Sequence, residues 1–230
     1  MTHDYSLIMA VMNAEKYIGQ TLESVFSQSF LPSQILIVDE FSTDKTVDVI
    51  RSFSPDIQIL NNTRPGMSAA MNFAIPMVTN DFVAFLDSDD LWLPTKAEKQ
   101  IAYLVENPAA DVVCSAVVNF RKENIEDMEF AASREFAPSR LFTASTFRTG
   151  TFKKYGFLDE SVGHFGWLYA WWSIANDAGI NCGSIEEVLL YRRIHESNSW
   201  VRRHDEANQT LFKIARSNIK RRTTDLAVEI

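Results

Sequence analysis

The 230 residues suffice for one domain of ordinary size or two small ones, and 46% hydrophobic with 12% aromatic residues indicates a globular protein, neither disordered nor fibrous. The net charge of -8 argues against a general nucleic-acid binder. No stretch approaches the roughly 18 apolar residues of a membrane helix, and the start lacks the basic and long apolar segments of a signal peptide, so we expect a cytoplasmic protein.

Strands and helices alternate along the first 62 residues. Apolar runs predict strands at 5–12, 34–44 and 57–62, and the second of these ends in acidic and turn residues. Helical spacing of apolar residues lies between them, at 14–30 and 45–54. This order predicts a parallel sheet with helices on both faces.

The next stretch continues the alternation. Residues 64–79 read as a loop entering a helix, with Ser68 as the expected cap, and 81–90 as a fourth strand. A helix is predicted at 92–107, with a proline near its start, and a further strand at 111–120.

The remainder is less regular. Residues 123–140 are polar, acidic and weakly periodic, which is typical of a mobile insertion or a loop on the acceptor side of a site. Helical or loop pieces follow to about 181, and 186–194 is a short strand. We therefore expect one main domain over 1–200 and a basic helical tail over 201–230.

The two cysteines are far apart in the sequence. Cys114 and Cys182 both lie among apolar or small residues. Buried free thiols are expected, in preference to a disulfide or a pair of metal ligands.

Three carboxylates follow the apolar run of the fourth strand. Asp87, Asp89 and Asp90 fall within four positions, where their charges repel and their burial is costly. A lone D-x-D segment is as consistent with a solvated turn as with a site. Here the acids stand at the C-terminal end of a strand, where ligands bind in open α/β sheets, and this favours a site.

Two classes of phosphate-binding protein are excluded because their sequence motifs are absent. The chain has neither a P-loop sequence nor a G-x-G-x-x-G fingerprint, and it has only eight glycines. A haloacid-type phosphatase also carries D-x-D after an apolar strand, and Asp87 to Asp89 fit that string. In such enzymes the pair follows an early strand, whereas three strands precede it here.

Six segments in the same order resemble the family 2 glycosyltransferases over roughly residues 5–200. They are VMNAEKYIGQTLESVFSQSF, IVDEFSTDKT, GMSAAMNFA, FLDSDDLWLPTKAEKQ, YGFLDES and LYRRIHESNS. The resemblance implies an α/β protein of the GT-A class: a Rossmann-like, mostly parallel sheet flanked by helices, here with a C-terminal helical extension. It also implies transfer of a hexose-type sugar from a nucleoside diphosphate sugar, with UDP the expected nucleotide.

The resemblance assigns roles to individual residues. Asp89 is the expected ligand of Mn²⁺ or Mg²⁺, because hard cations prefer oxygen ligands, and His195 is expected to contact that metal or the donor phosphates. Asp87 is expected on the ribose or metal side of the donor, and Asp39 on the nucleoside. Asp44 is expected to cap the following helix. The other positions expected near the nucleotide-sugar are Ala10, Met12, Asn13, Asn72 and Ser88.

The chain departs from the family pattern at the nucleotide side. Phe41 stands where the family has a glycine, and Met71 where it has an arginine expected near the diphosphate. Both changes remove nucleotide contacts and leave the metal pair in place.

A larger departure concerns the catalytic base. The acidic pair of inverting members aligns with Trp167 and Leu168, and neither side chain accepts a proton. Three explanations are open: an acceptor that is already anionic, a substitute base, with His164 first and Asp159 or Glu160 next, or a protein that binds without catalysing. Trp167 and Trp171 are the aromatic residues assigned to the acceptor, although aromatic runs also build cores.

The basic tail leaves two interpretations open. Residues 202–222 hold seven Lys or Arg against two acidic residues, with apolar residues at helical spacing. Such a helix either packs on the domain with a solvated basic side or contacts anionic lipid at a membrane surface. The acceptor, whether saccharide, lipid phosphate or peptide, is not identified by the sequence, and a homo-oligomer is a further expectation.

Overall fold

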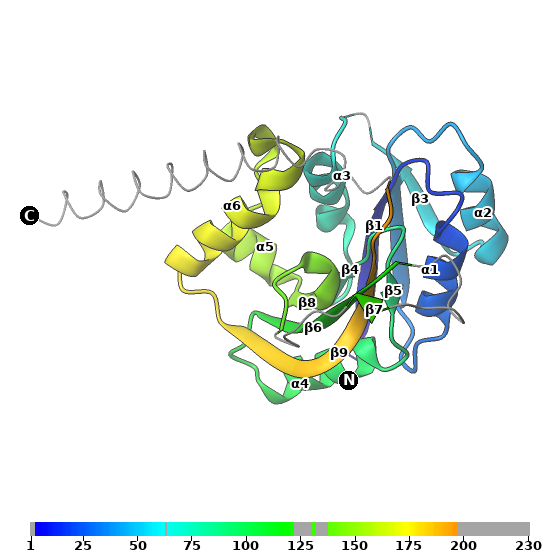
Figure 1. Ribbon diagram of the computed structural model, residues 1–230. Coiled ribbons are helices and arrows are strands. Elements are labelled where there is room, and N and C mark those ends of the chain that lie inside the picture. The colour runs from blue at the N-terminus through cyan, green and yellow to red at the C-terminus, as the bar shows by residue number, and fades with distance from the viewer. Residues whose placement is uncertain (1–2, 63, 122–129, 132–137, 197–230) are drawn as a thin grey trace, which may run out of the picture.

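A computed structural model describes residues 3–62, 64–121, 130–131 and 138–196 (Figure 1). Within these ranges the chain forms a nine-stranded sheet in which eight strands follow the order β3-β2-β1-β4-β8-β6-β9-β5 and β7 pairs with β6. No helix in this part of the chain is both long and apolar enough to cross a bilayer. The basic tail at 201–230 lies outside the described residues.

The first half of the sheet is parallel, as the alternation of apolar runs predicts. Its strands are β1 (Tyr5–Val11), β2 (Gln34–Asp39), β3 (Gln58–Asn61) and β4 (Phe82–Phe85), with β1 paired to β2 and β4. The connecting helices are α1 (Ile18–Phe26), α2 (Thr46–Phe53) and α3 (Met67–Ala74). All residues of β1 and β4 are buried, which explains why these strands read as continuous apolar runs.

The second half brings in antiparallel strands and makes the whole sheet mixed. Its strands are β5 (Leu91–Trp92), β6 (Val112–Phe120), β7 (Phe130–Ala131), β8 (Ser145–Arg148) and β9 (Cys182–Arg193). Strand β8 lies between β4 and β6 and is antiparallel to both. Strand β9 runs parallel to β6 and begins four residues before the predicted start.

Strand β8 was not predicted, because its sequence lacks an apolar run. Ser145 and Thr146 are fully buried, yet both are polar. The Ser145 hydroxyl donates to the Leu141 carbonyl and the Thr146 hydroxyl donates to the Gln100 side chain. Hydrogen bonds from these hydroxyls replace the apolar pattern on which strand prediction depends.

The remaining helices are α4 (Lys96–Glu106), α5 (Gly150–Tyr155) and α6 (Gly163–Asp177). Thr95 is the N-cap of α4 and directly follows Pro94, the proline near the start of the predicted helix. The prediction that Ser68 caps α3 is wrong: Gly66 is the N-cap residue, and Ser68 lies buried inside the first turn. The positive φ of Gly66, 111°, brings the chain into this helix in a conformation that favours glycine.

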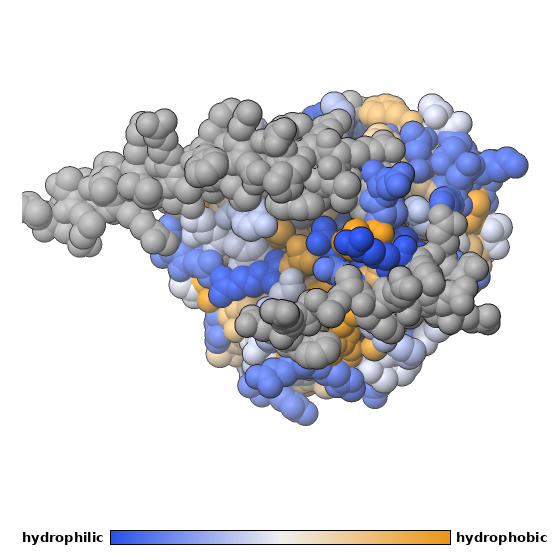
Figure 2. Space-filling model, in the orientation of Figure 1, coloured by the Kyte–Doolittle hydropathy of each residue, from blue (hydrophilic) through white to orange (hydrophobic). Residues whose placement is uncertain are grey.

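Two buried clusters cover the two faces of the sheet. One contains residues of α1, α2 and α4, and the other contains residues of α3, α5 and α6. Phe142 lies at the centre of the second cluster, with ring centroids 5.2 Å from those of Phe85 and Trp171. On the face shown in Figure 2, hydrophilic residues are interspersed with hydrophobic ones over the described part of the chain.

The two cysteines are free, as predicted, but they are neighbours in space. The parallel pairing of β6 with β9 brings the sulfur of Cys114 to 3.4 Å from that of Cys182. The hydrogen bond shared with Cys182, and then burial, raise the pKa of Cys114. Residues 68 positions apart in the chain therefore form one contact that their sequence surroundings do not indicate.

Lys96 is a charged residue in the core. It is 0% exposed, and its ammonium group donates to the Gln100 side chain at 2.7 Å and lies 4.3 Å from the centre of the Trp92 ring. Because burial disfavours the charged form, the pKa of Lys96 falls from the usual 10.5 to about 7. Between these values the unfolded chain binds a proton that the folded chain has lost.

This buried lysine predicts a pH dependence of stability. In the window from about pH 7 to 10.5 the free energy of unfolding should rise with pH, by up to about 1.4 kcal/mol per pH unit, because the unfolded state binds more protons. Lys96→Met should remove this contribution and increase the stability most at pH 7 and below. Urea unfolding at pH 7 and pH 9 measures both effects.

Lys99→Met is the matched control, since Lys99 lies on the same helix but pairs at the surface with Glu187. This variant should keep the pH slope of the parent. An unchanged slope in Lys96→Met would contradict the assignment of the titration to Lys96.

Candidate active site

Polar residues follow three neighbouring strands at one edge of the sheet. Val11 of β1 lies opposite Asp39 of β2, and Ile8 of β1 lies opposite Phe85, the last residue of β4. The segments that leave these strands, 12–15, 40–46 and 86–90, therefore start from the same side of the sheet. This is the carboxyl edge, where α/β sheets bind ligands.

The first two of these segments are joined by hydrogen bonds. The Asn13 side-chain oxygen accepts the N–H of Thr43 at 2.8 Å, and the Asn13 N–H donates to the Ser42 hydroxyl at 3.0 Å. Asn13 adopts a left-handed conformation with φ of 50°, which asparagine tolerates. The segment after β1 is thus held against the segment after β2.

Asp44 contributes to the same junction. One of its oxygens accepts the N–H of Glu15 at 3.1 Å, and the other accepts the N–H of Thr46, the first residue of α2, at 3.0 Å. These bonds lower the pKa of Asp44 although its partial burial opposes them. Asp44 therefore accepts the first N–H of α2, although the N-cap residue itself is Lys45 and not Asp44 as predicted.

Two exposed apolar side chains flank Asp39. Met12 is 62% exposed and Phe41 is 60% exposed, and Phe41 has a left-handed φ of 62°. Both oxygens of half-buried Asp39 accept the N–H of Ser42 at 3.3 Å. The neighbouring Glu40 accepts the N–H of Gly66 at 2.7 Å, and burial raises the pKa of Glu40. The phenylalanine found where the family has glycine thus keeps the backbone conformation that glycine adopts easily.

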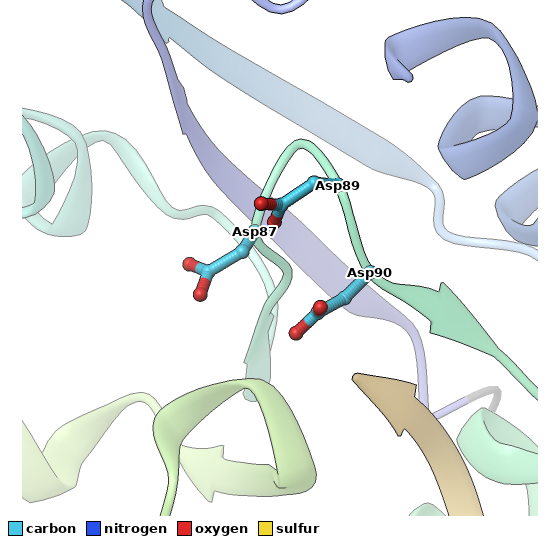
Figure 3. Close-up of side chains that lie close together, drawn as sticks. All are labelled: Asp87, Asp89 and Asp90. Carbon is cyan, nitrogen blue, oxygen red and sulfur yellow. The ribbon is translucent and has the colours of Figure 1, made fainter. Parts of the chain in front are cut away.

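The three acids after β4 converge. Figure 3 shows Asp87, Asp89 and Asp90 on the loop between β4 and β5, and ligand oxygens from all three lie within 4.8 Å of one another. Asp87 and Asp89 are half-buried, and Asp90 is 2% exposed. Burial, followed by the charge of Asp89, raises the pKa of Asp87 to about 7, and the charge of Arg192 opposes this rise. The same two causes raise the pKa of Asp90 well above its usual range.

The end of β9 faces this loop. The ring nitrogen Nε2 of His195 lies 2.8 Å from a carboxylate oxygen of Asp89, and the His195 ring packs against that of Tyr17, tilted by 36° with centroids 4.6 Å apart. The side chain of Arg193 donates from Nε to the Asp89 carbonyl, and its backbone N–H donates to Asp90 Oδ1, both at 2.9 Å. Two strands that are distant in the sequence therefore build the acidic site together.

The residues present fit a divalent cation. Oδ2 of Asp90 is buried and has no hydrogen-bond partner among the described residues. Burying such an oxygen beside two other carboxylates is costly, and a cation would offset that cost. A donor set of carboxylate oxygens suits a hard cation such as Mn²⁺ or Mg²⁺.

Several residues expected near the nucleotide-sugar have other contacts. The Asn72 side chain holds the segment before α6, because its oxygen accepts the N–H of Leu158 and its NH₂ donates to the Leu158 carbonyl and to Glu160. Ala10 is 5% exposed and its side chain packs in the core, so only its backbone is available. The carbonyl of Ser88 accepts the Thr21 hydroxyl at 3.0 Å, which ties the acidic loop to α1. Their roles toward a donor stay predictions.

The residues expected to act as the base or to contact the acceptor lie partly at the surface and partly in the core. Asp159 is exposed, and one of its oxygens accepts both the N–H and the hydroxyl of Ser161. His164 belongs to the first turn of α6, but its side chain lies outside what the structure describes. Trp171 is 1% exposed and donates its indole N–H to the Gly156 carbonyl, so it is a core residue and not an acceptor contact. Trp167 is partly buried against Phe142, and its acceptor role stays a prediction.

Sequence reasoning gave no role to three residues of the site. Asp90, Tyr17 and Arg193 all contact the acids or their partners, as described above. The signal for Asp90 was a third acid in a buried run, and the signal for Arg193 was its place in the segment that also holds His195. Nothing in the sequence around Tyr17 indicates that it lies beside a residue 178 positions later in the chain.

Comparisons with known proteins agree with this geometry. The model of the family described as glycosyl transferase family 2 matches residues 6–163. The Escherichia coli protein UDP-Glc:alpha-D-GlcNAc-diphosphoundecaprenol beta-1,3-glucosyltransferase WfaP is 29% identical over 203 residues, which cover 83% of this chain and 77% of WfaP. The putative glycosyltransferase EpsE of Bacillus subtilis (strain 168) is 30% identical over 120 residues, covering 50% of this chain and 43% of EpsE.

A solved structure supports the same fold. The crystal structure of S. aureus TarS 1-349 in complex with UDP superposes with a TM-score of 0.70 at 17% identity, covering 92% of this chain and 64% of the TarS chain. The predicted GT-A class of fold is thereby confirmed. This chain spans less than two thirds of that structure and less than half of EpsE.

The acidic loop yields a test of metal binding. Asp89→Asn keeps the size of the side chain and the backbone carbonyl that Arg193 contacts, but removes a charged ligand. We expect its Mn²⁺ affinity to fall by at least the roughly 10- to 100-fold seen for changes around metal sites, with an unchanged melting temperature. Calorimetric titration with Mn²⁺ measures the affinity.

Asp48→Asn makes the same change of charge at an exposed position of α2 and should bind Mn²⁺ like the parent. Equal affinities of Asp89→Asn and the parent protein would show that Asp89 is not a ligand.

Proposed function

The chain belongs to glycosyl transferase family 2, and from this we propose that it transfers a sugar from a UDP-linked donor to an acceptor, with Mn²⁺ or Mg²⁺ bound at the acidic loop. The observation that carries the proposal is that Asp39 ends β2 at the same edge of the sheet at which Asp87 and Asp89 converge, with His195 against Asp89. This arrangement offers a contact for a nucleoside and, a short way along the edge, ligands for a cation.

The side chains of the site have different proposed roles. Asp89 and His195 would hold the cation, and Asp87 would hold the cation or the ribose beside it. When bound, the cation would offset the negative charge that develops on the diphosphate as the glycosidic bond breaks. The left-handed Asn13 and Phe41 keep their two segments together beside Asp39, so that the carboxylate has a defined position before a nucleotide arrives.

The nucleotide is proposed from the relatives. WfaP carries UDP-Glc in its name, and solved TarS structures contain UDP or UDP-GlcNAc. The uracil N–H and the ribose hydroxyls can both donate hydrogen bonds to a carboxylate, so Asp39 suits a uridine nucleotide. Exposed Met12 and Phe41 add apolar surface on which a base can rest.

The acceptor is proposed to be a saccharide carried on a lipid diphosphate. WfaP, which matches over most of both chains, has such an acceptor in its name, and so does WfgD of Escherichia coli, 36% identical over 104 residues. A sugar hydroxyl gains roughly 10²–10⁴-fold in rate from a positioned base. Because Trp167 and Leu168 stand at the usual acidic positions, the base is proposed to be Asp159 or His164.

The missing acidic pair supports a second candidate function, a binding or scaffold subunit that retains nucleotide-sugar without turning it over. Release of UDP from UDP-glucose or UDP-GlcNAc in the presence of Mn²⁺ and a lipid diphosphate saccharide tests the two. Metal-dependent release identifies the enzyme. Mn²⁺-dependent binding of UDP without release, across a panel of donors and acceptors, identifies the binding subunit.

Asp39 provides the prediction for the nucleoside. Asp39→Ala should weaken UDP binding by roughly 10- to 100-fold with or without metal, since a hydrogen bond to a charged group contributes about 1.5–3 kcal/mol. Asp56→Ala, at an exposed position before β3, is the control and should leave UDP binding unchanged. Equal UDP affinities of Asp39→Ala and the parent, measured by calorimetry, would remove Asp39 from the site.

Membrane contact through residues 202–222, which lie outside the described residues, is part of the proposal because a lipid-linked acceptor is confined to a membrane surface. Each basic residue near an anionic surface contributes about 1 kcal/mol. The protein should sediment with phosphatidylglycerol vesicles at low salt and be released at high salt. If it stays in the supernatant at low salt, the tail has another role, in packing or in homo-oligomer formation.

A further inference from the structure

Arg193 is a deeply buried cation that contacts the acidic loop. It is the last residue of β9 and is 2% exposed. Its guanidinium lies between two rings, 4.8 Å from the centre of Tyr17 and 4.6 Å from the centre of Phe120. The terminal nitrogen Nη2 donates to the Gln20 side chain of α1 at 2.7 Å. The side chain is therefore held between α1, with its N-cap Tyr17, and the end of β6.

From this position Arg193 holds two consecutive residues of the acidic loop. Its Nε donates to the carbonyl of Asp89, and its backbone N–H donates to the carboxylate of Asp90, both at 2.9 Å. Other contacts of the loop are the Thr21 hydroxyl on the Ser88 carbonyl, His195 on the Asp89 carboxylate, and one turn hydrogen bond of 3.3 Å from the Asp90 N–H to the Asp87 carbonyl. Arg193 thus holds the Asp89–Asp90 part of the loop, while α1 holds Ser88.

The loop needs this support because its charges repel. Three carboxylates within 4.8 Å of one another favour an arrangement in which they separate, and a cation site requires them to converge. A buried guanidinium beside the Asp89 backbone opposes that separation before any cation binds. When a site already has its binding geometry, binding does not have to supply the free energy of ordering the loop, and the affinity is higher.

We propose that Arg193 is a positioning residue that holds the 87–90 loop in the geometry in which Asp87 and Asp89 bind one divalent cation. The proposal rests on the proposed function for the identity of the cation site. Arg193 acts through the loop backbone, and the planar guanidinium, with Nε and Nη2 pointing to different partners, suits this task better than an ammonium group.

The chain offers a matched arginine elsewhere. Arg148 of β8 also donates from Nε to a backbone carbonyl, that of Ala110 at 2.9 Å, and also lies over a ring, 5.4 Å from the centre of Phe82. Arg148 also donates to the carbonyls of Leu104 and Asn107, none of which belongs to the acidic loop, so its role is to stabilise the fold. A comparison of the two separates positioning of the site from general stability.

The experiment titrates the whole protein with Mn²⁺ alone, and separately with UDP in the absence of metal. Arg193→Gln should lower the Mn²⁺ affinity by about 10- to 100-fold, the range seen when partners of metal ligands are removed, while metal-free UDP affinity changes less than about twofold. Arg148→Gln should lower the melting temperature and leave both affinities unchanged. A folded Arg193→Gln protein with Mn²⁺ affinity within about twofold of the parent overturns the proposal.

A second variant decides the question if Arg193→Gln does not fold. Gln20→Leu removes only the partner of Nη2 and leaves Arg193 in the chain, and we expect a weaker Mn²⁺ affinity, by about 2- to 10-fold. An unchanged affinity there overturns the proposal. A parent that binds Mn²⁺ tightly but releases no UDP from any donor contradicts the enzymatic function alone, so the two failures are distinguishable.

Discussion

Repulsion among Asp87, Asp89 and Asp90 is the constraint on which the organisation of the site depends. Three carboxylates with ligand atoms within 4.8 Å of one another do not stay together unless other groups hold them. The groups that do so come from the end of β9: the backbone and side chain of Arg193, and the ring of His195. The last described strand is therefore as much a part of the site as the strand that carries the acids.

The mixed arrangement of the sheet is what brings β9 to the acidic loop. Strand β9 reaches the acidic loop because it runs parallel to β6 over its whole length and, near its C-terminal end, pairs with the short β5 that follows the loop. Strand β8, inserted antiparallel between β4 and β6, separates the parallel half from this second part of the sheet. The polar residues of β8 are satisfied by hydrogen bonds to Leu141 and Gln100, so the insertion leaves no unsatisfied hydroxyl in the core.

The nucleotide side is organised differently. There, neutral hydrogen bonds between the segments after β1 and β2 hold Asn13 and Phe41 in left-handed conformations beside Asp39. A phenylalanine in such a conformation costs energy that glycine would not, and it places an exposed ring at the rim. In α6, where acceptor contacts were expected, Trp171 is buried. Only the partly exposed aromatic residues of that helix are therefore available to an acceptor.

The sequence by itself determined the parallel half of the sheet, the position of the acids at a strand end and the family, because these depend on local features: continuous apolar runs, turn residues and motifs in a given order. It also predicted that His195 belongs with the acids, through the resemblance of its segment. Only the tertiary structure decided that Arg193, Tyr17 and Gln20 support the acidic loop, that the two cysteines touch, and that β8 is a strand. Each of these depends on contacts between residues distant in the chain, and a buried polar side chain is identified by the partner that satisfies it, which no local pattern contains.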